Sequence, residues 1–123
     1  MSNKSLWEIL WDYDPNCLLV VDPQMTIHVT NAAFNVLFQT SSSEIIGKNA
    51  SVFFDDLTHF KTAWEQEITI TEEKSFLRYG TFLRLIIFPL KAENLIACIM
   101  VNLTKEHEQD QYLARMKEEL LNN

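Results

Sequence analysis

Glycine is scarce in this sequence, and the motifs that depend on it are missing. The 123-residue chain contains two glycines, so it has no glycine-rich loop of the kind that cradles a phosphate group. It also lacks the H-E-x-x-H pattern of zinc hydrolases, and its serine, histidine and aspartate residues follow no order that indicates a catalytic triad. We therefore predict that the protein is not an enzyme.

Positive charge and long apolar runs are sparse as well. Ten lysines and arginines face seventeen aspartates and glutamates, which gives a formal net charge of −7, and the basic residues form no cluster. A nucleic-acid surface needs such a cluster, so we expect no nucleic-acid partner. The longest apolar runs, such as LRLIIFPL and LIACIMV, are far shorter than a membrane span, and no signal-peptide pattern opens the chain. We expect a cytoplasmic protein without a membrane segment.

Cysteine and histidine are too few and too scattered for a metal site. Cys17 and Cys98 lie in apolar, strand-like runs, where a reduced thiol behaves as a small hydrophobic side chain. The histidines His28, His59 and His107 lie in separate segments and have no metal-ligand spacing. We predict neither a disulfide bond nor a metal centre.

The apolar sequence that is present suffices for one folded domain. Hydrophobic residues make up 47% of the chain, and 123 residues can bury a core without disulfides or metals. We expect residues 1–123 to form a single domain, with a flanking helix at 4–12, a core at 16–104 and a C-terminal helix at 105–122.

The first half of the core predicts a hairpin that leads directly into a helix. Residues 18–21 and 26–30 are strand-like runs on either side of a proline-containing turn. Asn31 follows at a position typical of a helix N-cap, because its side-chain oxygen can accept a hydrogen bond from a free N–H of the first turn. A further helix is expected over residues 57–66.

The second half of the core predicts strands whose two faces are both apolar. Residues 68–71, 81–90 and 94–103 read as strands, and in the last two neither face is polar. The internal helices can cover only one side of a sheet. The N-terminal helix, a partner subunit or both must therefore cover the other side.

Amphipathic helices at the two ends of the chain indicate a dimer. Apolar residues fall at helical spacing in residues 4–12, and three and four apart, as in a coiled coil, in residues 105–122. A capping helix packed on its own domain would explain the C-terminal pattern equally well. The candidate interface residues are Leu6, Trp7, Leu10, Trp11, Leu113, Met116 and Leu120.

Three segments, in this order, resemble the PAS family of sensory domains. LLVVDPQMTIHVTNAAF is similar to the family's strand, aspartate turn, second strand and helix-opening asparagine, and SSSEIIGKN resembles the Glu-x-x-Gly-Lys turn that follows. VNLTKEH resembles the Asp-Ile-Thr end of the last strand, with Asn102 in place of the aspartate. The resemblance covers roughly residues 6–104. It implies an α+β fold, a five-stranded antiparallel sheet of order 2-1-5-4-3 with short helices on one face and amphipathic helices at both ends.

The resemblance also implies an interior lined by aromatic side chains, where PAS domains hold ligands or pack side chains. Such rings would either form the wall of a pocket for a small apolar or aromatic ligand or form the core itself, and the sequence favours the core because bulky rings fill cavities. The candidate pocket residues are Phe34, Phe38, Phe53, Phe60, Trp64 and Arg84.

No cofactor is identified by the sequence. The Asn-Cys-Arg-Phe-Leu segment of PAS light sensors that bind flavin is missing. Haem would need an axial imidazole, and His59 lies in the expected helix. Helical geometry places it about 100° from Phe60, on which the buried face is centred, so a surface histidine is the better interpretation.

The function implied by the resemblance is that of a cytoplasmic sensory or dimerisation module of a signal-transduction regulator. It would bind a small ligand or a partner and relay the signal through its terminal helices to an output domain or a partner signalling protein. A ligand-free interaction module that forms homodimers is the first alternative, and a small-molecule enzyme is the second. The enzyme hypothesis depends on Arg84, because an arginine on a central strand must find an anion or point to solvent.

Overall fold

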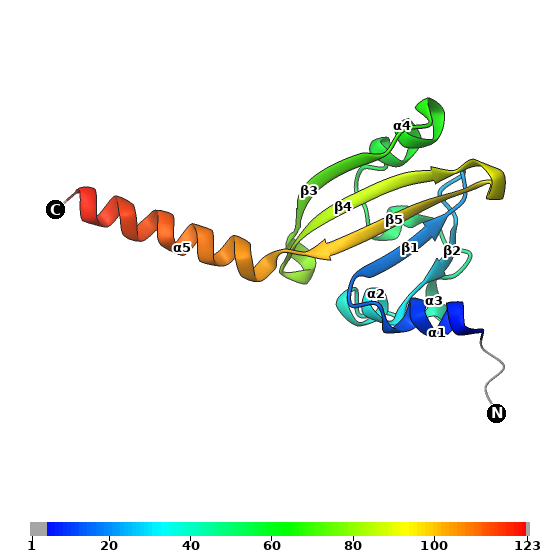
Figure 1. Cartoon of the computed structure of the whole chain (residues 1–123), viewed down its shortest axis with the longest axis horizontal. Coiled ribbons are helices and arrows are strands. Elements are labelled where there is room, and N and C mark those ends of the chain that lie inside the picture. The colour runs from blue at the N-terminus through cyan, green and yellow to red at the C-terminus, as the bar shows by residue number, and fades with distance from the viewer. Residues whose placement is uncertain (1–4, 123) are drawn as a thin grey trace.

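The computed structural model describes residues 5–122, apart from the side chain of Trp7. One antiparallel sheet organises these residues, with its strands in the order β2-β1-β5-β4-β3, which confirms the predicted α+β fold and strand order. Figure 1 shows the arrangement. In chain order the helices and strands are α1 (Leu6–Tyr13), β1 (Cys17–Val21), β2 (Ile27–Thr30), α2 (Ala32–Leu37), α3 (Ser42–Ile45), α4 (Thr58–Gln66), β3 (Ile70–Phe76), β4 (Thr81–Leu90), β5 (Leu95–Asn102) and α5 (Thr104–Leu121). Short 3₁₀ turns lie at η1 (Ala50–Val52), η2 (Leu77–Tyr79) and η3 (Lys91–Glu93).

The turn between β1 and β2 is closed by the carboxylate of Asp22. One carboxylate oxygen accepts hydrogen bonds from the backbone N–H groups of Gln24 at 2.9 Å and Thr26 at 3.0 Å. The other carboxylate oxygen lies 3.0 Å from the imidazole of His28. An aspartate that satisfies its own turn in this way fixes the hairpin, which the sequence predicted from the proline turn alone.

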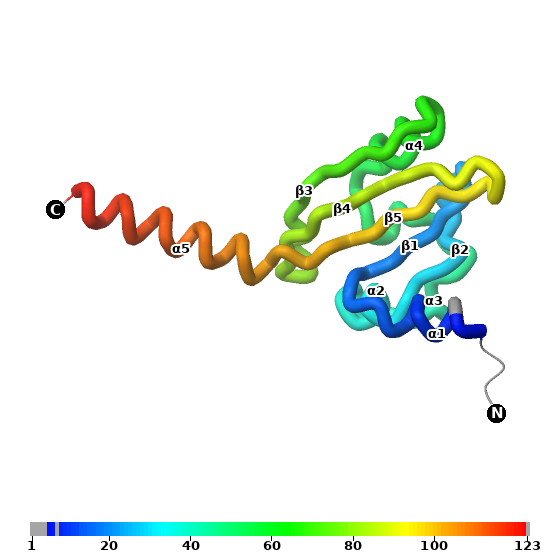
Figure 2. Tube along the Cα trace, in the orientation of Figure 1, coloured from blue at the N-terminus to red at the C-terminus, as the bar shows by residue number. Residues whose placement is uncertain are grey.

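The middle of the sheet is apolar on both faces, as the sequence predicted. Along β1 every residue is buried, and along β4 the fully buried residues Leu83, Leu85 and Ile87 alternate with partly exposed ones. Figure 2 shows β1 and β5 side by side through the centre of the sheet. The helices α2 and α4 pack on β1 and β4 respectively and cover the inner face.

The third strand begins two residues later than the alternating pattern predicted. Glu67 ends α4 in a left-handed conformation with φ of 54°, and the N–H of Ile68 still bonds to the carbonyl of Ala63 in that helix. Ile68 therefore belongs to the helix end, and pairing with β4 starts at Ile70.

The C-terminal helix α5 leaves the sheet as an extended arm (Figure 1). It has no buried residue along its length. Within residues 5–122, no helix combines the length and apolar character needed to cross a membrane.

Candidate functional site

The side chain of Asn31 connects α1, β1 and α2. It is fully buried, and its carboxamide oxygen accepts hydrogen bonds from the N–H of Leu18 in β1 at 2.9 Å and of Phe34 in α2 at 3.0 Å. Its amide nitrogen donates to the carbonyls of Trp11 at 3.1 Å and Asn16 at 2.9 Å. The predicted N-cap is confirmed, and the same side chain also fastens the end of α1 to the sheet.

The aromatic residues predicted to line the interior pack against one another. The rings of Phe34 and Phe38 stack with their centroids 4.4 Å apart, and Phe53 meets both rings edge-on at 5.4 and 5.3 Å. Phe38 also contacts Phe76 at 5.8 Å and Tyr79 at 4.9 Å. Between α2 and the sheet, these residues therefore serve as core, which is the interpretation that the sequence favoured.

The remaining predicted pocket residues lie further along the molecule. Phe60 is buried in α4 and meets Phe54 edge-on at 5.4 Å. Trp64 is half-buried, and the ammonium group of Lys91 lies 3.6 Å from the centre of its ring. Trp64 thus holds the turn between β4 and β5 against α4 through a cation–π contact.

The prediction that Arg84 lines the interior is wrong. Because Arg84 lies between the buried residues Leu83 and Leu85 on β4, its side chain points to the outer face of the sheet. It is exposed there and forms an ion pair with Glu73 of β3 at 2.9 Å. The outer face also carries Phe82 and Phe88.

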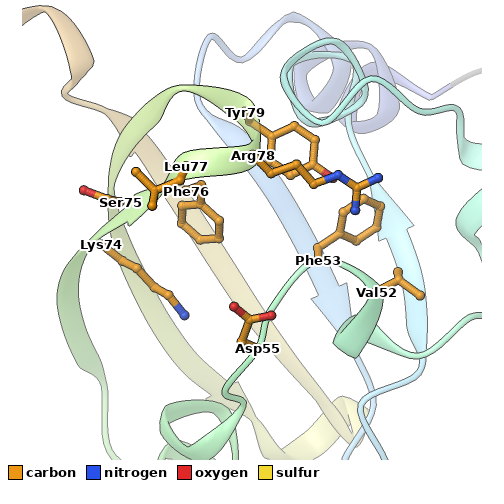
Figure 3. A pocket seen from close by; sticks show the side chains of 9 residues that line it. All are labelled: Val52, Phe53, Asp55, Lys74, Ser75, Phe76, Leu77, Arg78 and Tyr79. Carbon is orange, nitrogen blue, oxygen red and sulfur yellow. The ribbon is translucent and has the colours of Figure 1, made fainter.

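A cleft opens on the surface at the edge of the aromatic core (Figure 3). Its volume is about 230 Å³. One wall is the segment from Val52 to Asp55, and the other is the end of β3 with the turn that follows, from Lys74 to Tyr79. Phe53 is the one predicted pocket residue in its lining, so the cleft is a different place from the pocket that the sequence suggested.

The outer face of the sheet carries an apolar groove beside α1. Its volume is about 250 Å³. Leu10 and Trp11 of α1 form one side, and Leu18, Phe88 and Ile99 of the sheet are among the residues that form the other. Two predicted interface residues therefore line this groove, and Leu6 is exposed on the same helix. The side chain of Trp7 lies outside the described residues.

The predicted interface residues of α5 are all exposed. Leu113, Met116 and Leu120 are 62%, 42% and 76% exposed. The interpretation of α5 as a helix that caps its own domain is therefore wrong, because a capping helix would bury this stripe.

The start of α5 is fixed to the sheet by Phe82. The N–H of Phe82 donates to the Thr104 hydroxyl at 2.9 Å, and its carbonyl accepts from the N–H of Leu103 at 2.8 Å. The imidazole of His107 stacks on the Phe82 ring with a centroid distance of 4.0 Å. Asn102 accepts a hydrogen bond from the N–H of Thr104 at 3.0 Å. These contacts hold the first turn of α5 against the end of the sheet.

The cysteines and histidines form no reactive centre within the described part of the chain. Cys17 and Cys98 are buried free thiols, and burial raises the pKa of both, that of Cys17 to about 11. Both thiols therefore stay protonated at neutral pH. His59 is exposed and pairs with Glu72. Residues 5–122 contain no group of three or more acidic, histidine or cysteine side chains placed to hold a metal ion.

Comparison with protein-family models identifies the family to which this chain belongs. The family model for the PAS domain matches residues 15–105. The chain belongs to the PAS domain family. PAS domains are, in general, sensory modules of signalling proteins and commonly join output domains or dimerise. A sequence search of curated proteins gave no match.

Solved PAS structures share this fold at low sequence identity. The PAS domain of nitrogen regulation protein NR(II) from Vibrio parahaemolyticus is 18% identical, with a TM-score of 0.65 over 80% of this chain and 99% of that one. The photoactive yellow protein domain of the sensor histidine kinase Ppr from Rhodospirillum centenum is 15% identical, with a TM-score of 0.60 over 76% and 91% of the two chains. The PAS domain of BvgS from Bordetella pertussis is 18% identical, with a TM-score of 0.55 over 93% and 92%.

Sequence reasoning missed two features of this PAS domain. It identified Asn31 as a helix cap but not as the residue that binds α1, because Trp11 is 20 residues away in the sequence. It also missed the charged cleft, whose residues Asp55, Lys74 and Arg78 follow no periodic pattern. The available signal was that two basic residues, Lys74 and Arg78, lie two positions to either side of Phe76.

Proposed function

We propose that this PAS domain is a dimerisation module of a signalling protein, in which two copies pair through the outer face of the sheet and α1. The apolar groove between Leu10 and the sheet residues Leu18 and Ile99 carries this assignment. Apolar side chains gathered on an exposed face mark interaction surfaces, because burying them releases ordered water and lowers the free energy.

A second copy of the chain is the partner that the charges favour. The chain carries a net charge of −7, so most surfaces of two copies repel one another. The groove is lined by apolar residues apart from Asp14. At the margin of this face, Arg84 and Glu73 neutralise each other. Two copies can therefore approach here at low electrostatic cost, and a two-fold axis would pair the same patch on each.

The packed interior supports partner binding over an interior ligand. Phe34, Phe38 and Phe53 occupy the space between α2 and the sheet with ring centroids 4.4 to 5.4 Å apart. A ligand in that space would have to displace rings from favourable edge-on and stacked contacts.

The proposed signal route runs through the two terminal helices. α1 is fastened to β1 and α2 by Asn31, and α5 is fastened to β4 by Phe82. In α5, Leu113, Met116 and Leu120 have the spacing of coiled-coil core positions. Lys105 and Asp110 then fall at flanking positions that face each other in a parallel pair, and their charges are opposite. A rearrangement of the sheet interface would thus be transmitted through α5 to an output domain or partner protein.

The proposal also includes a cytoplasmic location and a non-catalytic role. Buried free thiols at Cys17 and Cys98 suit a reducing compartment. Arg84, the residue on which an enzyme hypothesis rested, lies on the outer face in an ion pair with Glu73.

Sedimentation equilibrium of matched aspartate variants tests the dimer. The wild-type chain should sediment at twice its mass of 14.4 kDa. Leu10→Asp puts a charge into the groove and should give monomers, whereas Leu77→Asp changes a leucine that is 91% exposed in the β3–β4 turn and should leave the dimer intact. A Leu10→Asp protein that keeps its circular dichroism spectrum and stays dimeric would overturn the assignment.

A further inference from the structure

The cleft of Figure 3 has the composition of a binding site for an organic anion and lies outside the proposed dimer interface. It lies between the loop Val52–Asp55 and the end of β3, at the edge of the inner side of the sheet. The groove beside α1 lies on the outer side and shares no lining residue with it. We propose that the cleft binds a small organic carboxylate with an aromatic or apolar body.

Neither cation in the cleft forms a salt bridge with a described carboxylate, although hydrogen bonds from Thr58 and, to a lesser extent, the charge of Lys74 lower the pKa of the neighbouring Asp56. Lys74 and Arg78 contact aromatic rings instead, with the Lys74 ammonium 5.5 Å from the centre of Phe76 and the Arg78 guanidinium 5.4 Å from that of Tyr79. Arg84, which lies on the other face of the same sheet, is by contrast paired with Glu73. The donors of Arg78 are therefore available to a ligand, whereas the charge of Lys74 is partly offset by Asp55 and Asp56.

The charge balance selects an anion with one negative group. Asp55 in the lining and the neighbouring Asp56 offset the charge of Lys74, so the positive charge of the cleft lies at Arg78. In Figure 3, Asp55 lies near Lys74 at one end, and Arg78 lies at the other. A planar carboxylate suits the forked donors of a guanidinium, whereas a phosphate dianion would be repelled more strongly by Asp55.

The floor of the cleft selects the body of the ligand. Phe53, Phe76 and Tyr79 supply it, and each of these rings also contacts Phe38 in the core. A flat apolar group can pack on these rings, where the charged ends of the cleft still reach its carboxylate. A volume of about 230 Å³ fits a molecule with a single ring and a short side chain.

Titration with three probes of matched shape tests the charge preference. Phenylacetate, 2-phenylethanol and phenethylamine share a ring and a short chain. The first ends in an anionic group, the second in a neutral hydroxyl and the third in a cationic group. In ¹H–¹⁵N spectra of the full chain, phenylacetate should shift the amides of residues 53–55 and 74–79. Losing a charge-assisted hydrogen bond should weaken 2-phenylethanol at least about tenfold, and phenethylamine should cause no saturable shift.

Variants with opposite expected signs separate charge recognition from damage to the fold. Arg78→Gln should weaken the binding of phenylacetate about tenfold. Asp55→Asn removes a repelling charge and should strengthen that binding. Arg84→Gln is the matched control on the opposite face and should leave the affinity unchanged. Equal binding of the three probes, shifts outside the cleft, or wild-type affinity in Arg78→Gln would each overturn the assignment.

Discussion

Asn31 illustrates how much one buried amide can organise. Its two polar atoms satisfy backbone groups of α1, β1 and α2 and of the residue that precedes β1. Buried backbone groups without partners are costly, so the geometry of this junction depends on that one side chain. The sequence predicted the local cap because the cap bond spans three residues. The bonds to Trp11 and Asn16 depend on the tertiary fold and could not be predicted from spacing.

Removing the Asn31 amide should destabilise the whole domain. Asn31→Ala leaves buried N–H and carbonyl groups unsatisfied, so the free energy of unfolding should fall by about 2–4 kcal/mol in urea denaturation. Asn49→Ala is the control, because Asn49 also caps a turn but is exposed, and it should cost under about 1 kcal/mol. Equal losses for the two variants would contradict the role of Asn31.

Asp22 should make the stability of the hairpin depend on acidic pH. Burial raises the pKa of this carboxyl, but hydrogen bonds from His28, Thr26 and Gln24 outweigh burial and hold the pKa below its ordinary value. A lowered pKa stabilises the fold above the ordinary aspartate pKa of about 3.9, and this contribution is lost as the pH falls through the pKa of the folded state.

Asp22→Asn should therefore be less stable than wild type at pH 7. The difference should shrink as the pH falls below about 4. Urea denaturation from pH 7 to pH 2 measures this difference, with Glu118→Gln on the exposed helix α5 as the control. A difference between Asp22→Asn and wild type that stays constant over this range would contradict the account.

The helix α5 depends on a few contacts at its first turn. Beyond His107 its side chains are exposed, so the direction of the arm is set where Thr104 and His107 meet Phe82 of β4. The sequence predicted this helix within a residue at each end from its spacing and polarity. It did not predict the stack of His107 on Phe82, because this contact joins residues from separate elements.

Replacing His107 should loosen the first turn of α5 without unfolding the sheet. His107→Ala removes the ring stack, which is worth about 0.5–1.5 kcal/mol, so amide exchange in the first turn should speed up about two- to tenfold. Hydrogen exchange by NMR can follow the N–H of residue 107, which bonds to the carbonyl of Leu103. Glu108→Ala, one position further along, should leave the exchange rate unchanged, and equal acceleration in both variants would argue against the stack as the anchor.

Periodicity predicted the sheet because each strand repeats its pattern over several residues. In β4, alternation alone indicates that Leu83, Leu85 and Ile87 lie on the same, buried face. Arg84 was misassigned because the apolar residues on both of its sides suggested a fully enclosed strand. Its ion pair with Glu73 depends on the register of β3 against β4, which the sequence does not specify.

At the scale of the whole molecule, the two faces of the sheet have different uses. The inner face carries the aromatic core, with the charged cleft at its edge, and the outer face carries the apolar groove beside α1. Composition alone indicated that both faces were apolar. Which of them remains open depends on where the helices pack, and α2 and α4 pack on the inner face.

Native mass spectrometry of the purified protein, compared with its denatured mass, tests the central claim most directly. We predict a species at twice the 14.4 kDa mass of the chain, because two copies pair through their outer sheet faces. A species that remains monomeric across the accessible concentrations would contradict the account.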